Sequence, residues 1–265
     1  MKRYLFGSVL VLAALISFSA CNKDDDDNNN NNPSGKANVT MRLTDGPADY
    51  DAVYLDIQSV EVVMNGGGTV TLNPVRPGIY DILRFRNGLD TLLLRADIPA
   101  GTVSQIRLVL GDNNSVVVNG MSHELTTPSG QTSGIKLNLN ESFVAGGAYV
   151  IWIDFDAAKS IHETGNGKYM LKPVIRAYSA ETDGRIEGYV IPLAALTTVY
   201  AINGTDTFAA IPDPVSAYFR FGGLPAGTYD VWFDATALGY QDELISNVQV
   251  SYGTKTDLGT ITITP

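Results

Sequence analysis

The chain has 265 residues, a net charge of −10 and a single cysteine, Cys21. A protein with this negative net charge repels nucleic acid and anionic lipid headgroups, so we expect no nucleic-acid partner. Sugars, proteins and divalent cations remain compatible with such a surface. One cysteine excludes internal disulfides and thiolate metal sites, and the length allows two domains that burial alone stabilises.

The first 20 residues have the layout of a bacterial secretory signal. Lys2 and Arg3 precede the apolar run Tyr4–Ile16, and small residues then lead to Cys21. The apolar run is too short for a transmembrane helix, which needs about 20 apolar residues. We therefore expect a signal peptide at residues 1–20 and acyl chains, palmitate among them, on Cys21 as the membrane anchor. A free or bridged thiol at Cys21 is the alternative.

Residues 21–36 are too polar to fold and predict a disordered, solvated tether. The run Cys21-Asn22-Lys23-Asp24-Asp25-Asp26-Asp27 opens this tether. The run resembles the surface-export signal of Bacteroidetes lipoproteins, and that resemblance implies an outer-membrane lipoprotein exposed on the cell surface. The alternative is an ordinary linker that leaves the protein facing the periplasm.

Residues 37–180 predict a first β domain, because short β-branched and aromatic runs alternate with turn residues. Apolar positions alternate from Val53 to Ile57 and then change phase at Val60, so we expect a bulge near Ser59. One short helix is expected at Ala157–His162, with Asp156 as its N-cap. Helical periodicity is otherwise almost absent, which favours an all-β fold of antiparallel strands.

Residues 181–265 predict a second, smaller β domain. The turn Glu181-Thr182-Asp183-Gly184 separates it from the first. Inside it, Val231 and Phe233 belong to one face of a strand and Trp232 to the other. About seven short strands without intervening helices are typical of a sandwich. The whole prediction is therefore two antiparallel β-sandwich domains in tandem after the lipidated tether.

Asp154 and Asp156 are the sharpest candidates for a functional site. Residues two apart on a strand point the same way, so both carboxylates share the face of Trp152. Two like charges this close favour a counter-charge, and Ca²⁺ would serve. The favoured alternative is that Asp156 caps the helix and Asp154 pairs with a basic side chain, since Ca²⁺ takes about six to eight oxygen ligands. The candidate bases are Lys159, Lys172 and Arg176.

A second acidic group consists of Asp45, Asp49 and Asp51, whose spacing fits turns better than an EF-hand loop. Asp45 joins Asp154 and Asp156 as a candidate calcium ligand, and the metal hypothesis strengthens if the two groups meet in space. Calcium is the one cofactor that we consider.

Catalytic motifs are not found in the sequence. Two histidines, His123 and His162, are too few for an ordinary zinc site, and no Gly-x-Ser-x-Gly elbow occurs. We therefore expect no catalytic residue and no enzyme, although a glycosidase-like carboxylate pair from distant parts of the chain stays open.

Several motifs follow one another along residues 37–180. They are Leu43-Thr44-Asp45-Gly46-Pro47, Ile98-Pro99-Ala100-Gly101, Asp154-Phe155-Asp156-Ala157-Ala158-Lys159 and Leu171-Lys172-Pro173. On these motifs the stretch resembles the lipoprotein ectodomain family catalogued as domain of unknown function 4382. The resemblance implies a β-sandwich-like surface domain, and it implies no activity.

Other motifs recur across residues 184–265. They are Gly184-Arg185-Ile186-Glu187-Gly188, Phe219-Arg220-Phe221-Gly222-Gly223-Leu224-Pro225-Ala226-Gly227 and Gly239-Tyr240. On these motifs the stretch resembles the carboxypeptidase-regulatory-like, transthyretin-like sandwiches. The motifs are turn-and-strand motifs, so the resemblance implies a fold and not an activity.

Two classes of function are compatible with the sequence. The first is a non-catalytic cell-surface module for binding, adhesion or assembly, with an extracellular glycan or protein as partner and Trp152, Trp232 and several tyrosines available for stacking. The second is a Ca²⁺-dependent or carboxylate-based hydrolase acting on extracellular glycan or peptide. Carboxylates with raised pKa values in one cleft would favour the hydrolase, and an exposed aromatic platform or free sheet edge would favour the binder.

Overall fold

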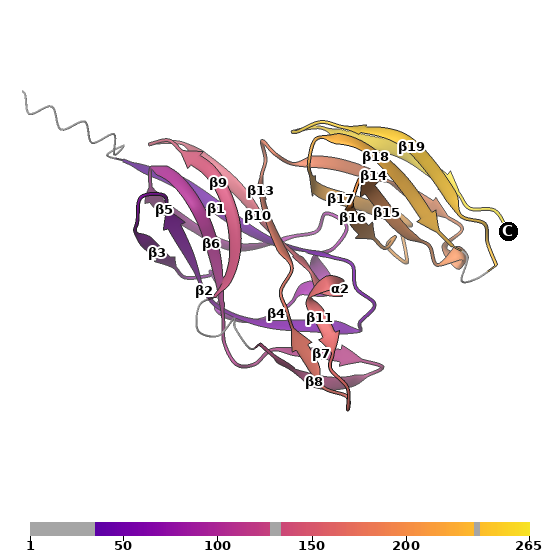
Figure 1. Cartoon of the computed structure of the whole chain (residues 1–265), viewed down its shortest axis with the longest axis horizontal. Helices are drawn as coiled ribbons and strands as arrows, with labels where there is room; N and C mark the ends of the chain where they lie inside the picture. Colours follow the sequence, from indigo (N-terminus) through magenta and orange to yellow (C-terminus); the bar gives the residue numbers. More distant parts are fainter. Residues whose placement is uncertain (1–34, 128–133, 236–238) are drawn as a thin grey trace, which may run out of the picture. The chain divides into compact units, whose positions relative to one another are not determined.

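The structure is a computed structural model that describes residues 35–127, 134–235 and 239–265 (Figure 1). Strands dominate it, which confirms the all-β prediction. Cys21, the signal peptide at 1–20 and nearly all of the tether at 21–36 lie outside the described residues, so those expectations stay predictions. Within the described chain, no helix combines the length and the apolar character that a membrane crossing needs.

The first sandwich consists of two sheets that enclose one hydrophobic core. The smaller sheet has, in spatial order, β13 (Ile175–Ser179), β10 (Ala148–Asp156), β1 (Lys36–Gly46) and β5 (Thr91–Pro99). The larger sheet has β11 (Ile161–Glu163), β12 (Tyr169–Leu171), β8 (Met121–Thr126), β7 (Ser115–Val118), β2 (Ala52–Met64), β6 (Gly101–Leu110) and β9 (Ile135–Phe143), with β3 (Thr69–Leu72) and β4 (Gly78–Asp81) paired to β2.

Alternation along the strands builds this core. Val39, Met41 and Leu43 of β1 are buried, as are Ile153 and Phe155 of β10, while the residues between them point away from the core. Each fully buried aliphatic or aromatic side chain contributes about 1.5 to 3 kcal/mol. The same alternation fixes which side chains are left for the outer face of β10, and these include Trp152 and Asp154.

The predicted bulge in β2 is confirmed. The pairing of β2 with β6 shifts register between Ile57 and Ser59, which is where the apolar positions change phase in the sequence. Because side chains alternate with a period of two, one extra residue is needed to keep Val60 and Val62 on the buried side.

The expectation of purely antiparallel strands is wrong in three places. β1 pairs with β10 in parallel, β12 pairs with β8 in parallel, and in the second sandwich β14 pairs with β20 in parallel. Parallel strands need a long connection, and residues 47–147 supply one between β1 and β10. Alternating burial is the same in both orientations, so the pattern within one strand does not reveal the direction of its neighbour.

The second sandwich has its own core, drawn from residues 186–263. One sheet has, in order, β17 (Tyr218–Leu224), β14 (Gly184–Ile191) and β20 (Lys255–Thr262), and the other has β16 (Asp206–Ala210), β15 (Thr198–Asn203), β18 (Gly227–Asp234) and β19 (Glu243–Val250). Phe219, Tyr229 and Phe233 are among its largest buried side chains. The two cores are separate, but both belong to one compact unit of the chain.

The helical elements are short. They are α2 (Ala157–Ser160) and the 3-10 turns η1 (Ile82–Phe85) and η2 (Leu193–Ala195). Asp156 caps α2 as expected, because its carboxylate accepts a hydrogen bond from the backbone N–H of Lys159. The helix is shorter than the expected range Ala157–His162, since Ile161 and His162 pair with β12 as part of β11.

Candidate functional site

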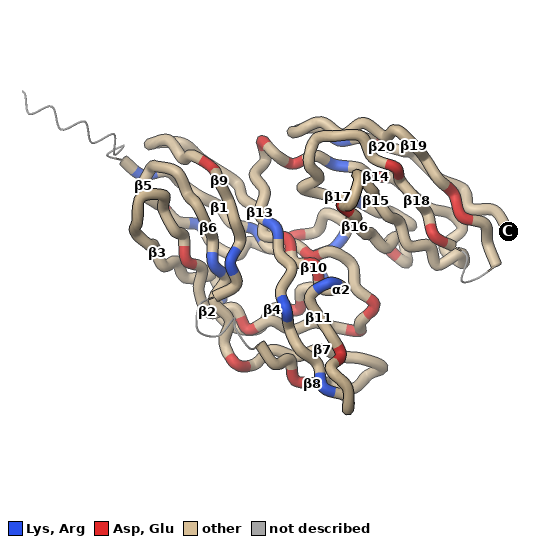
Figure 2. The backbone as a smooth tube through the Cα atoms, in the orientation of Figure 1, with Lys and Arg blue, Asp and Glu red and all other residues tan. Residues whose placement is uncertain are grey.

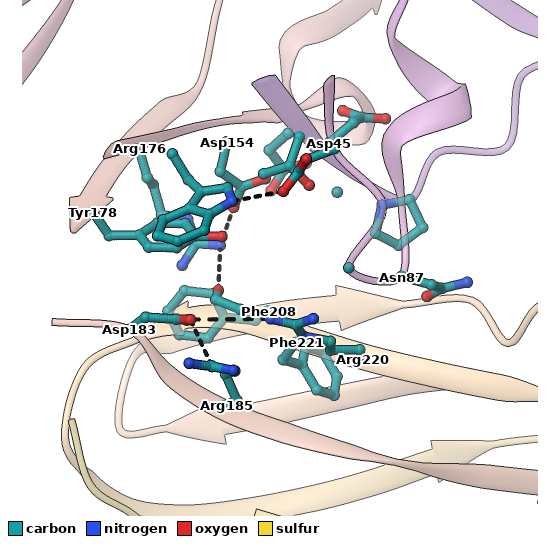
Figure 3. A pocket seen from close by; sticks show the side chains of 18 of the residues that line it. Asp45, Asn87, Asp154, Arg176, Tyr178, Asp183, Arg185, Phe208, Arg220 and Phe221 are labelled. Carbon is teal, nitrogen blue, oxygen red and sulfur yellow. Dashed lines mark hydrogen bonds and ion pairs between the residues drawn. The ribbon is translucent and has the colours of Figure 1, made fainter. Parts of the chain in front are cut away.

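A polar cleft of about 300 Å³ collects most of the candidate residues (Figure 3). The first sandwich lines it with Asp45, Trp152, Asp154, Asp156, Arg176 and Tyr178, among others, and the second with Asp183, Arg185, Phe208, Arg220 and Phe221. Acidic positions are otherwise spread along the described chain and not gathered in one segment (Figure 2). The properties of the cleft therefore follow from its local pairing of charges and not from the net charge of the protein.

Asp154 pairs with Arg176, which was the favoured alternative to a metal role. Arg176 stands opposite Asp154 in the pairing of β13 with β10, and its guanidinium donates to the Asp154 carboxylate. The same guanidinium donates to the backbone oxygens of Gly223 at 3.2 Å and Gly222 at 3.4 Å, and it lies 4.6 Å from the ring centroid of Phe208. Burial raises the pKa of Asp154 despite this cation.

Asp156 is also occupied locally. In addition to capping α2, its carboxylate lies 2.9 Å from the ammonium of Lys159, which in turn donates to the backbone oxygen of Thr207 at 2.8 Å. Both acids of the β10 pair therefore have a basic partner within the protein.

Asp45 lies near the end of β1, two residues after Leu43 and four after Met41. Side chains alternate along a strand, so Asp45 points to the same buried side as these two residues and is only 5% exposed. One carboxylate oxygen accepts a hydrogen bond from the N–H of Ala157 at 3.3 Å, and the other, Oδ2, is buried without a partner among the described residues. Burial, and then the nearby Asp154 carboxylate, raise the pKa of Asp45 well above its usual range. The two acidic groups do meet in space through this residue.

Replacing Asp45 with asparagine is expected to raise the melting temperature at pH 7. The folded carboxyl holds its proton more tightly than the unfolded one, so its contribution to stability is complete below the unfolded pKa of about 3.9 and is lost as pH rises through the raised folded pKa. Asparagine removes the charge that Asp154 and Asp156 repel and that Arg86 attracts only weakly. Removal of this buried charge is worth about 1 to 3 kcal/mol.

Thermal melts of both proteins between pH 4 and pH 7 check this expectation. The exposed Asp97→Asn is the matched control and should change neither the melting temperature nor its pH dependence. A lower melting temperature for Asp45→Asn at pH 7 would contradict a strained carboxylate at this position.

The remaining acids of the second group lie elsewhere. Asp51 accepts a hydrogen bond from the backbone N–H of Gly120 at 2.7 Å, which is a turn role of the kind expected. Asp49 is exposed and borders a different hollow, lined mainly by apolar residues such as Leu193 and Ile211. Only Asp45 of this group therefore contributes to the cleft.

The calcium hypothesis stays a prediction that the structure does not favour. Among residues 35–127, 134–235 and 239–265, no three or more acidic, histidine or cysteine side chains are arranged as ligands of one ion. Because Asp154 and Asp156 already pair with Arg176 and Lys159, we expect Ca²⁺ at up to about 10 mM to leave the melting temperature unchanged. A rise that disappears in Asp156→Asn would restore the calcium site.

The opposite wall of the cleft carries two arginines that the sequence did not single out. Arg185 of β14 and Arg220 of β17 both approach Asp183 Oδ2, at 2.6 and 4.0 Å (Figure 3). Asp183 is 2% exposed and accepts a hydrogen bond from the N–H of Gly223 at 2.8 Å. The Arg185 contact is an ion pair without hydrogen-bond geometry, since its Nε has no hydrogen-bond partner in the described chain.

Trp152 is less available for stacking than expected. Its ring lies parallel to that of Tyr178, its neighbour across β10 and β13, with centroids 5.6 Å apart and an interplanar angle of 11°. Its indole N–H donates to Asp90, which also pairs with Arg42. One face of the indole is therefore covered, and only part of the side chain lines the cleft.

Trp232 belongs to a row of side chains on the outer face of the second sandwich. Cross-strand pairing places Ala209, Tyr200, Trp232 and Leu244 side by side over β16, β15, β18 and β19. The Tyr200 and Trp232 rings stack with centroids 5.2 Å apart, and Leu244 is 55% exposed. The Trp232 indole N–H donates to Asp242 at 3.1 Å, which fixes the orientation of the ring. We call these four residues the outer row.

Comparisons with solved structures give weak similarities. A cohesin–X-dockerin complex from Acetivibrio cellulolyticus matches at 24% identity and a TM-score of 0.25, over 30% of this chain and 56% of that one. The TIE protein of Bacillus anthracis matches at 10% identity and a TM-score of 0.24, over 86% of this chain and 34% of that one. The minor pilin of Streptococcus agalactiae matches at 8% identity and a TM-score of 0.20, over 87% of this chain and 95% of that one. The chain thus spans 56% of the length of the matched cohesin–X-dockerin chain and 34% of the length of the TIE protein.

A comparison with families gives a definite result, although no curated protein is similar enough to count as a relative. The model of the family described as domain of unknown function (DUF4382) matches residues 36–173, which include β1, β10 and α2 and therefore all three candidate aspartates. This range is more than half of the chain and contains the first sandwich almost completely. The chain belongs to the DUF4382 family.

Proposed function

We propose that this protein is a non-catalytic binding module, anchored by Cys21 at the cell surface and engaged in binding, adhesion or assembly with an extracellular glycan or protein. The outer row carries this proposal. It joins four strands into one apolar and aromatic strip on a face that the second core does not use. Leu244 is exposed and the other three side chains are half-buried. Apolar strips that solvent reaches mark interaction sites, and aromatic side chains dominate the energetics of such sites.

The charges of the cleft support the same proposal. Asp154, Asp156 and Asp90 each pair with a basic side chain, so these carboxylates have structural partners. Catalytic acids and bases need free access to a reacting atom, and a carboxylate held by a guanidinium has less of it.

Replacing Trp232 with alanine is expected to weaken binding to the partner at least about tenfold, because truncation of a central aromatic anchor typically costs about 2 kcal/mol or more. The full chain, displayed on cells, would be tested against a glycan array and against extracellular protein extracts with quantified binding. Tyr252→Ala removes a more exposed aromatic ring, 50% exposed, from a turn beyond β19 and serves as the control. Equal binding by both variants would rule out the outer row as the contact surface.

The anchor is tested separately, since its basis is the sequence alone. We expect mass spectrometry of the mature chain to find acyl chains on Cys21, and protease treatment of intact cells to digest the two sandwiches. Cys21→Ser should release the protein from membranes. Complete protection from protease would place the sandwiches in the periplasm.

A hydrolase is the second candidate, favoured by one observation. Asp45 and Asp154 share a cleft and both have raised pKa values, as a general acid requires. Release of reducing ends or amines from glycan or peptide substrates, abolished by Asp45→Asn, would establish this activity in place of the binding proposal.

A further inference from the structure

The two walls of the cleft differ in charge. Four acid–base pairs can be assigned around it, in which Asp154, Asp156, Asp90 and Asp183 pair with Arg176, Lys159, Arg42 and Arg185. Two lining groups then remain, Asp45 on the first sandwich and Arg220 on the second. Asp45 is only 5% exposed and its Oδ2 is buried, whereas the guanidinium of Arg220 lies 4.0 Å from Asp183, beyond hydrogen-bond distance, so the weakly paired charge of the cleft is on the arginine side.

Among the residues that the structure describes, Arg220 forms an ion pair with Asp183 and with no other acid. Its guanidinium lies 4.0 Å from the same Asp183 oxygen that Arg185 approaches at 2.6 Å, and its Nε is buried without a hydrogen-bond partner in the described chain. Glu187, the residue opposite Arg220 across β14 and β17, is taken by the ammonium of Lys255 at 2.7 Å and the hydroxyl of Tyr218 at 3.1 Å. One carboxylate therefore serves two arginines.

The surroundings hold Arg220 in the cleft. Asn87 and Gly88 form a turn with positive φ values of 55° and 79°, a combination that suits these two residue types. A Cβ atom on Gly88 would come within 2.5 Å of Arg220 Nη1, so the turn and the guanidinium are in close contact. Asn87 also donates to the backbone oxygen of Ile211 at 2.9 Å, which ties this turn to the second sandwich.

We propose that the cleft binds the uronate unit of an acidic glycan, with Arg185 and Arg220 receiving its carboxylate and the facing acidic wall accepting hydrogen bonds from its hydroxyls. Two guanidiniums that share one buried carboxylate offer the planar donor geometry that a second carboxylate fits. The wall opposite presents the carboxylates of Asp90 and Asp156, whose side chains are 17% and 26% exposed, and carboxylate oxygens accept hydrogen bonds and so match donating hydroxyls.

Size and polarity agree with one sugar unit. A volume of about 300 Å³ is at the lower end of ligand pockets. A peptide carboxyl terminus would also satisfy the arginines, but only its N–H groups match acceptors on the opposite wall and its carbonyls do not, whereas each hydroxyl of a sugar can donate. This inference goes beyond the proposed function, because it assigns a ligand to the cleft, which Ala209 of the outer row borders but which Tyr200, Trp232 and Leu244 do not line.

Calorimetric titration of the purified full chain in detergent would test the cleft, with D-glucuronate, D-glucose and the dipeptide Ala-Ala as probes at up to about 20 mM. We expect glucuronate to bind and to raise the melting temperature, and glucose and Ala-Ala to bind at least about tenfold more weakly. Arg220→Gln should reduce glucuronate affinity about tenfold or more, and Arg220→Lys should reduce it less, since it keeps the charge and loses the planar fork.

The matched control is Arg84→Gln, because the Arg84 side chain is 79% exposed, pairs with Asp81 and does not line the cleft. It should bind glucuronate like the parent chain. Arg185→Lys gives a second test if Arg220→Gln does not fold, and it should also weaken binding. Equal affinity for glucose, equal affinity for Ala-Ala, undiminished binding by the folded cleft variants, or no glucuronate binding by the parent chain would each overturn the assignment. None of these results depends on Trp232, so the binding role of the outer row would survive them.

Discussion

Replacing Arg176 with methionine is expected to cost about 3 kcal/mol of unfolding free energy. Methionine keeps much of the aliphatic volume but leaves Asp154, which is 7% exposed, without the guanidinium that pairs with it. The backbone oxygens of Gly222 and Gly223 lose their donor in the same step. Removing one member of a buried pair is costly mainly because the remaining charge is stranded, and the partial exposure of Arg176 places the cost at the lower end of that range.

Urea denaturation at pH 7 measures this loss. The double variant Arg176→Met with Asp154→Asn should recover most of it, since no buried charge then remains. Lys159→Met is the control, because its pair with Asp156 is half exposed and should contribute about 1 kcal/mol at most. If the double variant is no more stable than Arg176→Met, the stranded carboxylate is not the cause.

Replacing Phe233 with alanine should destabilise the second sandwich by about 3 to 5 kcal/mol. The ring is completely buried and meets Phe219 edge to face, with centroids 5.7 Å apart, so its removal leaves a cavity between the two sheets. Differential scanning calorimetry would show the change as a lower melting temperature of the transition that includes residues 186–263.

The neighbouring residue on β18 provides the control. Trp232 is similar in size but belongs to the outer face, so Trp232→Ala should cost about 1 kcal/mol, far less than Phe233→Ala. Equal losses for the two variants would mean that β18 does not divide its side chains between a core face and an outer face.

Local features of the fold were predictable from the sequence because neighbouring residues determine them. The bulge at Ser59 follows from a change of phase within one strand, and the Asp156 cap from one residue before Ala157. The parallel pairing of β1 with β10 was not predictable, because it joins residues about 100 positions apart whose alternation fits either direction. Its consequences include the position of Asp45 beside Asp154.

The acidic half of the cleft was predictable and the basic half was not. Asp154 and Asp156 share a face because side chains alternate along a strand. Arg176, which pairs with Asp154, was one of the three candidate basic partners named from the sequence. In the sequence, Asp183 belongs to a predicted turn and Arg185 to the start of a predicted strand. Arg220 lies 35 residues after Arg185, so nothing local indicated that the three side chains meet. The available signal was that Arg185 and Glu187 alternate with Ile186 and Gly188 along one strand, which predicts that both charged side chains lie on its outer face.

If Cys21 carries the anchor proposed above, the position of β1 has a mechanical consequence. This strand is central in its sheet, bonded to β10 on one side and β5 on the other, with Lys36 at its start and Thr44, Asp45 and Gly46 of the cleft at its end. A pull between an anchor before Lys36 and a ligand held in the cleft would run along β1 and load both ladders in shear. Shear strains many hydrogen bonds at once, whereas peeling would break them singly. Resistance to such a pull is set by the unfolding rate, and this strand order would keep that rate low under tension.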